Sequence, residues 1–264
     1  MPLKPSSPEA ALTVEAASLS FGALRVIDAL SLTVGQGERH AILGPNGAGK
    51  TSLFNLLTGD LRPSAGRILF FGEDVTFLPT FERVRRGMRR TYQSSLLFSG
   101  LSVRDNLAVA VGGVSRNRCS IKPLASGGSV AAAVDRLLEL AGLTDIAGTR
   151  VAELSHGKQR QLEIGMALAG EPRLILLDEP AAGLSPAERE ELVVLLSVLP
   201  SGATFVLIEH DLEIALRVAD RMTVMHNGRL ILQGDPAEVV ADPLVQTLYM
   251  GETTVEAGEF DGIR

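Results

Sequence analysis

Tryptophan is absent from this 264-residue sequence, cysteine occurs once, and aromatic residues make up only 4% of it. The single cysteine, Cys119, excludes an internal disulfide and fits a reducing compartment. No apolar run approaches the roughly 18–20 residues of a membrane-spanning helix, and the N-terminus has no hydrophobic signal segment. The net charge of −6 argues against bulk binding of nucleic acid. These absences predict a soluble, cytoplasmic protein that reaches any membrane through a partner.

What is present favours a sizeable core, since 45% of the residues are apolar and the length fits one large domain or two small ones. Three segments have the pattern of strands in an antiparallel element: residues 13–20, 30–34 and 67–71. Residues 103–111 and 130–140 have helical periodicity, and residues 112–129 between them are rich in glycine and serine. The middle of the chain therefore predicts a helical lobe inserted in an α/β core.

A glycine-rich segment follows the apolar residues 41–43 and precedes a helical pattern. Its members are Gly44, Pro45, Asn46, Gly47, Ala48, Gly49, Lys50, Thr51 and Ser52. Strand, glycine-rich turn and helix with Gly-x-x-x-x-Gly-Lys-Thr is the context of a P-loop. Its backbone N–H groups form a concave anion site, and the helix start adds a positive dipole end. We predict a polyphosphate site with Lys50 on the β- and γ-phosphates and Thr51 on Mg²⁺, rather than a plain glycine turn.

An acid pair ends the apolar strand at residues 174–177. A continuous apolar run is typical of a buried parallel strand, and ligands bind at the carboxyl ends of such strands. Beside a P-loop, Asp178 would hold Mg²⁺ through water, and Glu179 could orient or deprotonate an attacking water. The alternative is a solvated strand end.

The sequence leaves two interpretations open for each of two side chains, Phe21 and His210, and one for a third, His40. Phe21 either packs in the core or stacks on a nucleobase. His210 follows a second buried strand, residues 204–208, where it either touches the γ-phosphate or is a hydrogen-bonded structural histidine. His40, in the strand before the glycine loop, is interpreted as structural.

Five arginines crowd residues 81–90: Arg83, Arg85, Arg86, Arg89 and Arg90. A nucleic-acid patch is disfavoured because aromatic residues hardly interleave with them and the chain is acidic. We expect a solvated helix face, or a face for an acidic partner. Gln93 follows, and by spacing alone it is only a polar residue near a strand end.

Residues 154–161 open another helix. Ser155 is a reasonable N-cap, and Leu162 and Ile164 supply apolar content. From these residues alone, a well-capped amphipathic helix and a binding motif are equally compatible.

In order, these segments resemble the ATP-binding subunit of an ABC transporter over nearly the whole chain. The resemblance rests on five ordered elements: residues 44–52, Gln93 after the basic segment, residues 154–158, Asp178-Glu179-Pro180 after its strand, and Glu209-His210-Asp211. Within that superfamily, further segments look like the branched-chain amino acid importer group, which includes relatives for urea, short amides and other polar solutes. These segments are residues 89–93, 161–168, 181–186 and 248–252.

The resemblance implies one ABC ATPase domain over residues 1–264, of the α/β class. The expected fold is a P-loop NTPase, RecA-like, with a parallel-sheet core, an antiparallel β subdomain and an inserted α-helical subdomain. The core and antiparallel part would comprise residues 12–93 and 151–264. The helical subdomain would span about 94–150, and a C-terminal tail about 253–264.

The resemblance also implies roles at a nucleotide site. Residues 44–52 would be the Walker A loop, with Lys50 catalytic, and Phe21 would stack on adenine. Asp178 would be the Walker B carboxylate, and with Thr51 and Gln93 it would bind Mg²⁺.

Other implied roles concern hydrolysis and a second subunit. Glu179 would be the catalytic carboxylate and His210 the switch histidine. Ser155 and Gly157 would form the signature that binds the γ-phosphate held by the other subunit, and residues 184–185 would belong to the D-loop.

The chain departs from the family pattern at four positions. His156 stands where the signature usually has glycine, and Lys158 where it has glutamine. Ser185 replaces the common D-loop aspartate, and Tyr92 stands where phenylalanine is more common. Because Ser155 and the glycine at position 157 remain, we expect function to survive.

The implied function is to power import of branched-chain amino acids or related small polar solutes, with ATP and Mg²⁺ as cofactors. The expected partners are a second ATP-binding subunit as homo- or heterodimer, integral membrane permease subunits and, indirectly, a solute-binding protein, with no nucleic acid. The chain would be cytoplasmic and peripheral on the inner face of the cell membrane.

Three alternatives remain. An ABC exporter ATPase of the lipopolysaccharide-export type looks similar. A soluble ABC ATPase of DNA repair or translation usually has a long coiled-coil insert or two fused units, which this chain lacks. A P-loop kinase or small-molecule transferase would not need residues 154–158 or His210.

Overall fold

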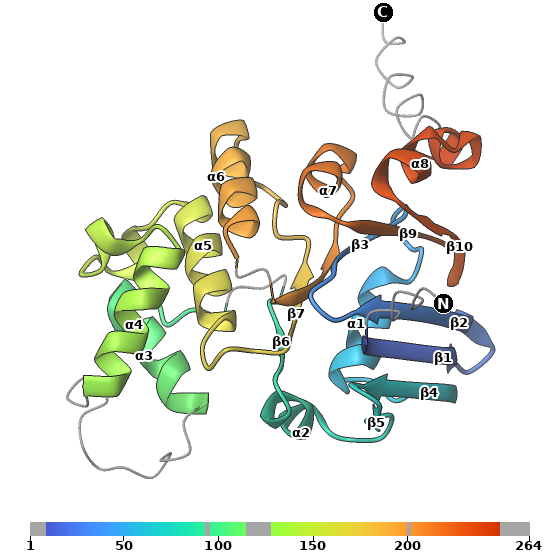
Figure 1. The fold of residues 1–264 in the computed structure, drawn as a ribbon, viewed down its shortest axis with the longest axis horizontal. Coiled ribbons are helices and arrows are strands. Elements are labelled where there is room, and N and C mark those ends of the chain that lie inside the picture. Colours follow the sequence, from blue (N-terminus) through green and yellow to red (C-terminus); the bar gives the residue numbers. More distant parts are fainter. Residues whose placement is uncertain (1–8, 93–95, 115–127, 200–201, 249–264) are drawn as a thin grey trace, which may run out of the picture.

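A computed structural model describes residues 9–92, 96–114, 128–199 and 202–248 (Figure 1). Two sheets lie beside each other, and a group of helices lies on the opposite side of the larger sheet from the smaller one. No helix within these ranges is both long and apolar enough to cross a membrane. The predicted α/β class with an antiparallel element is confirmed.

The larger sheet has the strand order β10-β9-β3-β8-β7-β6. Its strands are β3 (Arg39–Leu43), β6 (Met88–Arg90), β7 (Leu174–Asp178), β8 (Thr204–Ile208), β9 (Arg221–His226) and β10 (Arg229–Gly234). All neighbouring pairs are parallel except the hairpin β9–β10. Strand β8 separates β3 from β7, so the carboxyl ends of all three strands meet at one edge of the sheet.

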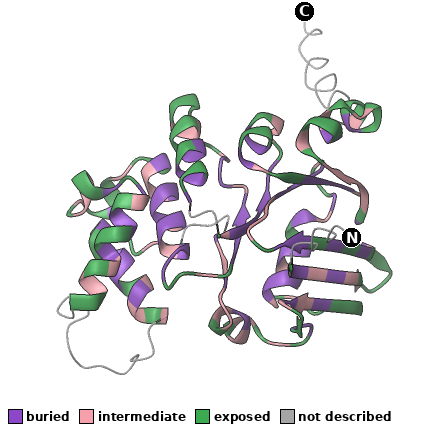
Figure 2. Ribbon diagram, in the orientation of Figure 1, coloured by how far each residue is buried: buried purple, intermediate pink, exposed green. Residues whose placement is uncertain are grey.

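Apolar runs form the central strands because both of their faces are covered. Every residue of β7 and β8 is buried (Figure 2). Along β7, Ile175 and Leu177 join one apolar cluster, whereas Leu174 and Leu176 join the other. This alternation places one core on each side of the sheet.

The smaller sheet has the order β2-β1-β4-β5 and is antiparallel. Its strands are β1 (Ala10–Phe21), β2 (Leu24–Gly35), β4 (Ala65–Phe70) and β5 (Glu73–Asp74). Helix α1 (Lys50–Thr58) shares a core with both sheets, since Phe54 and Leu57 are buried in the cluster that contains Leu12 of β1 and Val206 of β8. The helix after the glycine loop is thus fixed on two sides.

The other helices are α2 (Thr80–Arg85), α3 (Val103–Val114), α4 (Gly128–Leu140), α5 (His156–Ala167), α6 (Pro186–Ser197), α7 (Leu212–Val218) and α8 (Pro236–Ala241), with 3₁₀ turns η2 (Thr144–Ile146) and η3 (Val151–Glu153). Helices α3, α4 and α5 build the lobe drawn at the left of Figure 1, whereas α2 lies at the bottom and α7 and α8 lie at the right. Helices α3, α4 and α5 share one apolar cluster with β7. Helix α5 packs with α3 and α4 although it lies outside residues 94–150. The limits given above for the helical subdomain stay a prediction.

The expectation of a solvated arginine face was wrong for Arg83. The predicted helix over residues 81–90 ends at Arg85, and Arg83 is only 1% exposed. Its guanidinium donates to the carbonyls of Leu56 and Leu57 at 2.7 and 2.6 Å. The last carbonyls of an α-helix have no i+4 partner within the helix, and the buried Arg83 guanidinium supplies donors to two of them in α1. Burial lowers the pKa of Arg83 to about 10.

Candidate nucleotide site

The glycine loop leaves β3 through conformations that side chains rarely adopt. Gly44 has a φ of 151°, Gly47 of 80° and Gly49 of 99°. A Cβ on Gly44 would lie 2.3 Å from the carbonyl oxygen of Met225, so only glycine fits beside β9. Gly49 precedes α1, which begins at Lys50. The loop therefore ends on a helix N-terminus, as an anion site requires.

The loop and the end of β7 line one cleft of about 210 Å³. Its walls are Val26, Asn46, Gly47, Ala48, Gly49, Lys50, Thr51, Ser52 and Glu179. Glu179 lies far along the chain from the loop, but β8 alone separates their strands. The predicted meeting of the glycine loop and Glu179 is therefore present in the fold.

Lys50 is held inside the loop and is 5% exposed. Its ammonium donates to the carbonyl oxygen of Gly44 and, at 3.0 Å, to that of Pro45. These carbonyls hold the positive charge of Lys50 in the cleft, where an anionic phosphate would be attracted to it.

Asp178 is fully buried at the end of β7. Its Oδ2 pairs with a guanidinium nitrogen of Arg90 at 2.7 Å, whereas Oδ1 is buried without a hydrogen-bond partner among the described residues. Such an oxygen suits a metal-bound water. The described residues contain no group of three His, Cys, Asp or Glu side chains able to hold a metal. The buried Oδ1 of Asp178 is a carboxylate oxygen, the kind of ligand that Mg²⁺ and its bound waters contact.

Arg90 was also assigned wrongly to a solvated face, since its side chain is only 6% exposed. Besides Asp178, it donates to Asn55 Oδ1 of α1 at 2.6 Å. Its guanidinium also lies 4.8 Å from the centre of the Tyr92 ring. Arg90 thus connects β6 to both β7 and the helix α1 that follows the glycine loop. The signal in the sequence was its position three residues before Gln93, which itself lies outside the described residues.

Glu179 has a φ of 45°, in the left-handed region that a residue with a side chain rarely adopts. Its N–H donates to Ile208 at 3.0 Å, and its carbonyl oxygen accepts from Arg160 at 3.3 Å. Arg160 is 4% exposed and belongs to α5. Helix α5 therefore contacts the backbone of the acid pair, an interaction that the sequence did not predict.

The segment after β8 has a buried acid and an exposed histidine. Glu209 is fully buried, and burial raises the pKa of its carboxyl group. Its oxygens accept from the N–H groups of Ala181 at 2.9 Å and His210 at 3.3 Å. The side chain of His210 is 56% exposed and lies 3.9 Å from Glu209. The contact of His210 with γ-phosphate stays a prediction.

Phe21 and His40 differ in how far their side chains are exposed. Phe21 is 53% exposed, so the core-packing interpretation was wrong, and its stacking on adenine stays a prediction. His40 is fully buried between Glu38 Oε1 at 2.6 Å and Thr223 Oγ1 at 2.7 Å. Its structural interpretation is confirmed.

The signature residues do not line the glycine-loop cleft. Ser155 caps α5 by accepting from the N–H of Lys158, and its hydroxyl donates to Glu188 Oε1 at 3.0 Å. The ammonium of Lys158 is bound to Glu191 at 2.9 Å. Ser185 caps α6 with a reciprocal capping box, which gives the serine at the predicted D-loop position a local structural role.

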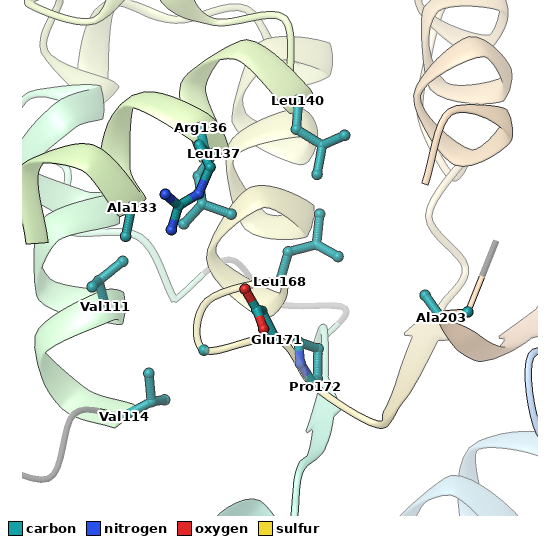
Figure 3. A pocket seen from close by; sticks show the side chains of 12 residues that line it. Val111, Val114, Ala133, Arg136, Leu137, Leu140, Leu168, Glu171, Pro172 and Ala203 are labelled. Atoms are coloured by element: carbon teal, nitrogen blue, oxygen red, sulfur yellow. The ribbon is translucent and has the colours of Figure 1, made fainter. Parts of the chain in front are cut away.

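A larger cavity of about 790 Å³ lies elsewhere, between α4 and the turn after α5 (Figure 3). Val111, Leu137 and Leu168 give it apolar walls, with Arg136 and Glu171 at its polar positions. None of the predicted nucleotide-site residues lines it.

Three features define a P-loop nucleotide-binding protein. They are a glycine loop that ends at a helix N-terminus, the lysine of that loop, and an acid pair at the end of β7, which is separated from β3 by β8. The family model described as ABC transporter matches residues 27–182. The chain belongs to the ABC transporter family, as an ATP-binding subunit with an ATPase domain.

Several relatives are similar over almost the full length. The high-affinity branched-chain amino acid transport ATP-binding protein BraF of Pseudomonas aeruginosa is 34% identical, over 91% of this chain and 98% of that protein. LivG of Escherichia coli K12, described in the same words, is 34% identical with the same coverage. The crystal structure of the ADP conformation of MJ1267, an ATP-binding cassette of an ABC transporter, is 31% identical with a TM-score of 0.80, over 92% of this chain and 99% of that one.

Proposed function

We propose that this chain powers import of branched-chain amino acids or related small polar solutes. The similarity to BraF and LivG over 91% of the chain supports this substrate class. The single observation that carries the ATPase mechanism is the cleft in which the glycine loop meets Glu179.

Within that cleft, the loop residues 44–52 would bind the phosphates, and Phe21 would stack on adenine. Thr51, Asp178 and Gln93 would hold Mg²⁺, which neutralises phosphate charge when bound. The buried Oδ1 of Asp178 supports its part in this site.

Glu179 would accept the proton of the attacking water, and Lys50 would stabilise negative charge on the β- and γ-phosphates. His210 would contact the γ-phosphate from the end of β8. The exposed ring of His210 supports this role, because a ring enclosed by the protein could not reach a ligand.

Two copies would bind head to tail, so that Ser155 and Gly157 of one copy reach the γ-phosphate bound by the other. ATP would favour the closed dimer over the open one, and hydrolysis would release it. Integral permease subunits would convert closure into alternating access, and a solute-binding protein would deliver the solute. The chain would thus lie at the cytoplasmic face of the membrane.

The variant Glu179→Gln tests this mechanism. It should bind ATP and dimerise with Mg²⁺, whereas hydrolysis should fall by roughly 10²–10⁴-fold because the general base is lost. Light scattering after size-exclusion chromatography and phosphate release measure the two effects. Normal turnover by this variant would exclude Glu179 as the catalytic carboxylate.

The substrate class needs a separate test. Cells lacking this chain should lose uptake of labelled leucine, isoleucine and valine, or of urea and short amides, and regain it with the wild type but not with Lys50→Ala. Unchanged uptake of all these solutes, with impaired lipopolysaccharide export, would favour the exporter instead.

A further inference from the structure

The carboxylate of Glu188 lies between the N-termini of α5 and α6. Its Oε1 accepts from the Ser155 hydroxyl at 3.0 Å and from the Gly157 N–H at 2.9 Å. Its Oε2 accepts from the N–H and the hydroxyl of Ser185 at 3.0 and 2.9 Å. One side chain therefore joins the signature to the D-loop.

The capping box of α6 explains only half of these contacts. In a capping box, the third residue of the helix bonds back to the N-cap, as Glu188 does to Ser185. The contacts to Ser155 and Gly157 join a different helix. They use a hydroxyl and a backbone N–H at the start of the 12-residue α5, which are donors suited to an anion.

The fit of the carboxylate on these donors is close. A Cβ at position 157 would lie 2.6 Å from Glu188 Cγ and Oε1, so glycine is needed for this approach. Hydrogen bonds from Ser185, Gly157 and Ser155 lower the pKa of Glu188 to about 2, with those from Ser185 the largest cause. The group is therefore an anion at neutral pH. The nearby carboxylate of Glu191 instead binds Lys158 and Gln161.

We propose that Glu188 is a positioning residue that occupies the phosphate-binding donors of the signature in the free protomer. When the dimer closes, the γ-phosphate bound by a second copy must replace Glu188 as the acceptor of the hydrogen bonds from the Ser155 hydroxyl and the Gly157 N–H. This inference rests on the proposed function, which assigns those two residues to the γ-phosphate. Glu188 opposes closure by competing for the donors and by adding a like charge beside the phosphate.

Loss of the hydrogen bond from Ser155 to Glu188 would also change the surroundings of Ser185, the predicted D-loop residue. Glu188 keeps its contacts to Ser185 when Oε1 loses its donors, because Oε2 makes them. The side chain then stays anchored on α6, so arrival of the phosphate at the signature changes the environment of the D-loop in the same subunit.

The test compares Glu188→Gln with Glu190→Gln, both in the Glu179→Gln background. Glutamine preserves the capping box but removes the charge, so the fold is maintained. Glu190 lies on the same helix and pairs with Arg217 of α7, away from the signature, so it controls for the change in net charge. The readout is the ATP concentration that gives half-maximal dimerisation with Mg²⁺, by analytical ultracentrifugation.

Glu188→Gln should lower this ATP concentration by roughly fivefold or more, the scale of ordinary coupling between sites, and Glu190→Gln should leave it unchanged. ATP affinity of the monomer should be equal in all variants, because Glu188 does not line the glycine-loop cleft. An unchanged or raised ATP requirement, or an altered monomer affinity, would overturn the role of Glu188. Failure of the Glu179→Gln parent to dimerise with ATP would instead contradict the proposed function, and with it the competition.

Discussion

The glycine loop and the segment that begins at Ser155 both lie at helix N-termini, but side chains of opposite charge lie beside them. Beside the loop lies the buried ammonium of Lys50, whereas the signature donors are bound by the carboxylate of Glu188. Under the proposed function, the first segment would attract phosphate within one protomer, whereas phosphate could reach the second only by displacing Glu188. Nucleotide binding and dimer closure would then be separate steps with separate free energies.

The two regions also differ in how they treat carboxylates. Asp178 is fully buried, and its carboxylate pairs with Arg90 through Oδ2, whereas Oδ1 has no hydrogen-bond partner among the described residues. Glu188 is partly exposed, and both its oxygens are bound by neutral donors. A desolvated carboxylate with a spare oxygen suits a cation, whereas a saturated one serves as an anchor.

The largest expected effect separates the two lysines of these regions. Lys50→Ala should reduce ATP hydrolysis by roughly 10²–10³-fold, because the cleft loses its buried charge. Lys158→Ala removes an ammonium bound to Glu191 on the surface between α5 and α6, and it should change hydrolysis by less than about threefold. Steady-state phosphate release measures both. Equal losses of hydrolysis in the two variants would mean that the buried charge of Lys50 matters no more than the surface charge of Lys158.

A second expected effect concerns the partner of Asp178. Arg90→Gln leaves a buried carboxylate without its charge partner, which should cost about 3 kcal/mol of unfolding free energy. It should also raise the Mg²⁺ concentration needed for hydrolysis, because Asp178 loses the contact that orients it. Urea unfolding and magnesium titration provide the measurements.

Arg85→Gln is the matched control for Arg90→Gln, since the Arg85 side chain is 54% exposed, pairs with Glu82 at 3.1 Å and lies over the exposed Phe81 ring. It should change stability by less than about 0.5 kcal/mol. Equal unfolding free energies of the two variants would mean that the pairing of Arg90 with Asp178 does not stabilise β7.

The smallest expected effect is a pH dependence of opposite sign in the two regions. Burial raises the pKa of Glu209, so its contribution to stability decreases as pH rises from the unfolded value near 4.5 through the folded pKa. The pKa of Glu188 is about 2, so its contribution decreases instead as pH falls from about 4.5 towards 2.

Unfolding free energies of Glu209→Gln and Glu188→Gln between pH 3 and 8 would separate these contributions. Relative to wild type, Glu209→Gln should lose less stability as pH rises, and Glu188→Gln should lose less as pH falls. The same sign of change in both variants would contradict the assigned environments.

Local patterns were sufficient for much of the fold. The glycine loop and the apolar strands β7 and β8 each have a signal within a few residues. The meeting of the loop and Glu179 followed from the rule that parallel strands present their carboxyl ends at one edge.

The contacts missed in the sequence all depend on tertiary partners. Arg83 and Arg90 looked like members of one basic helix, but Arg83 donates to carbonyls at the end of α1, and Arg90 pairs with the buried Asp178. The capping box at Ser185 and Glu188 is visible in the sequence, whereas the approach of Glu188 to Ser155 requires that α5 pack beside α6. Side-chain type alone does not identify such partners.

The central claim is that each complete site takes its loop from one copy and its signature from another. Mixing two inactive variants, Lys50→Ala and Ser155→Ala, tests it most directly, because a mixed dimer would have one intact loop facing one intact signature. Phosphate release by the mixture should exceed the sum of the separate variants and rise with the fraction of mixed dimers. A mixture no more active than that sum would contradict the claim.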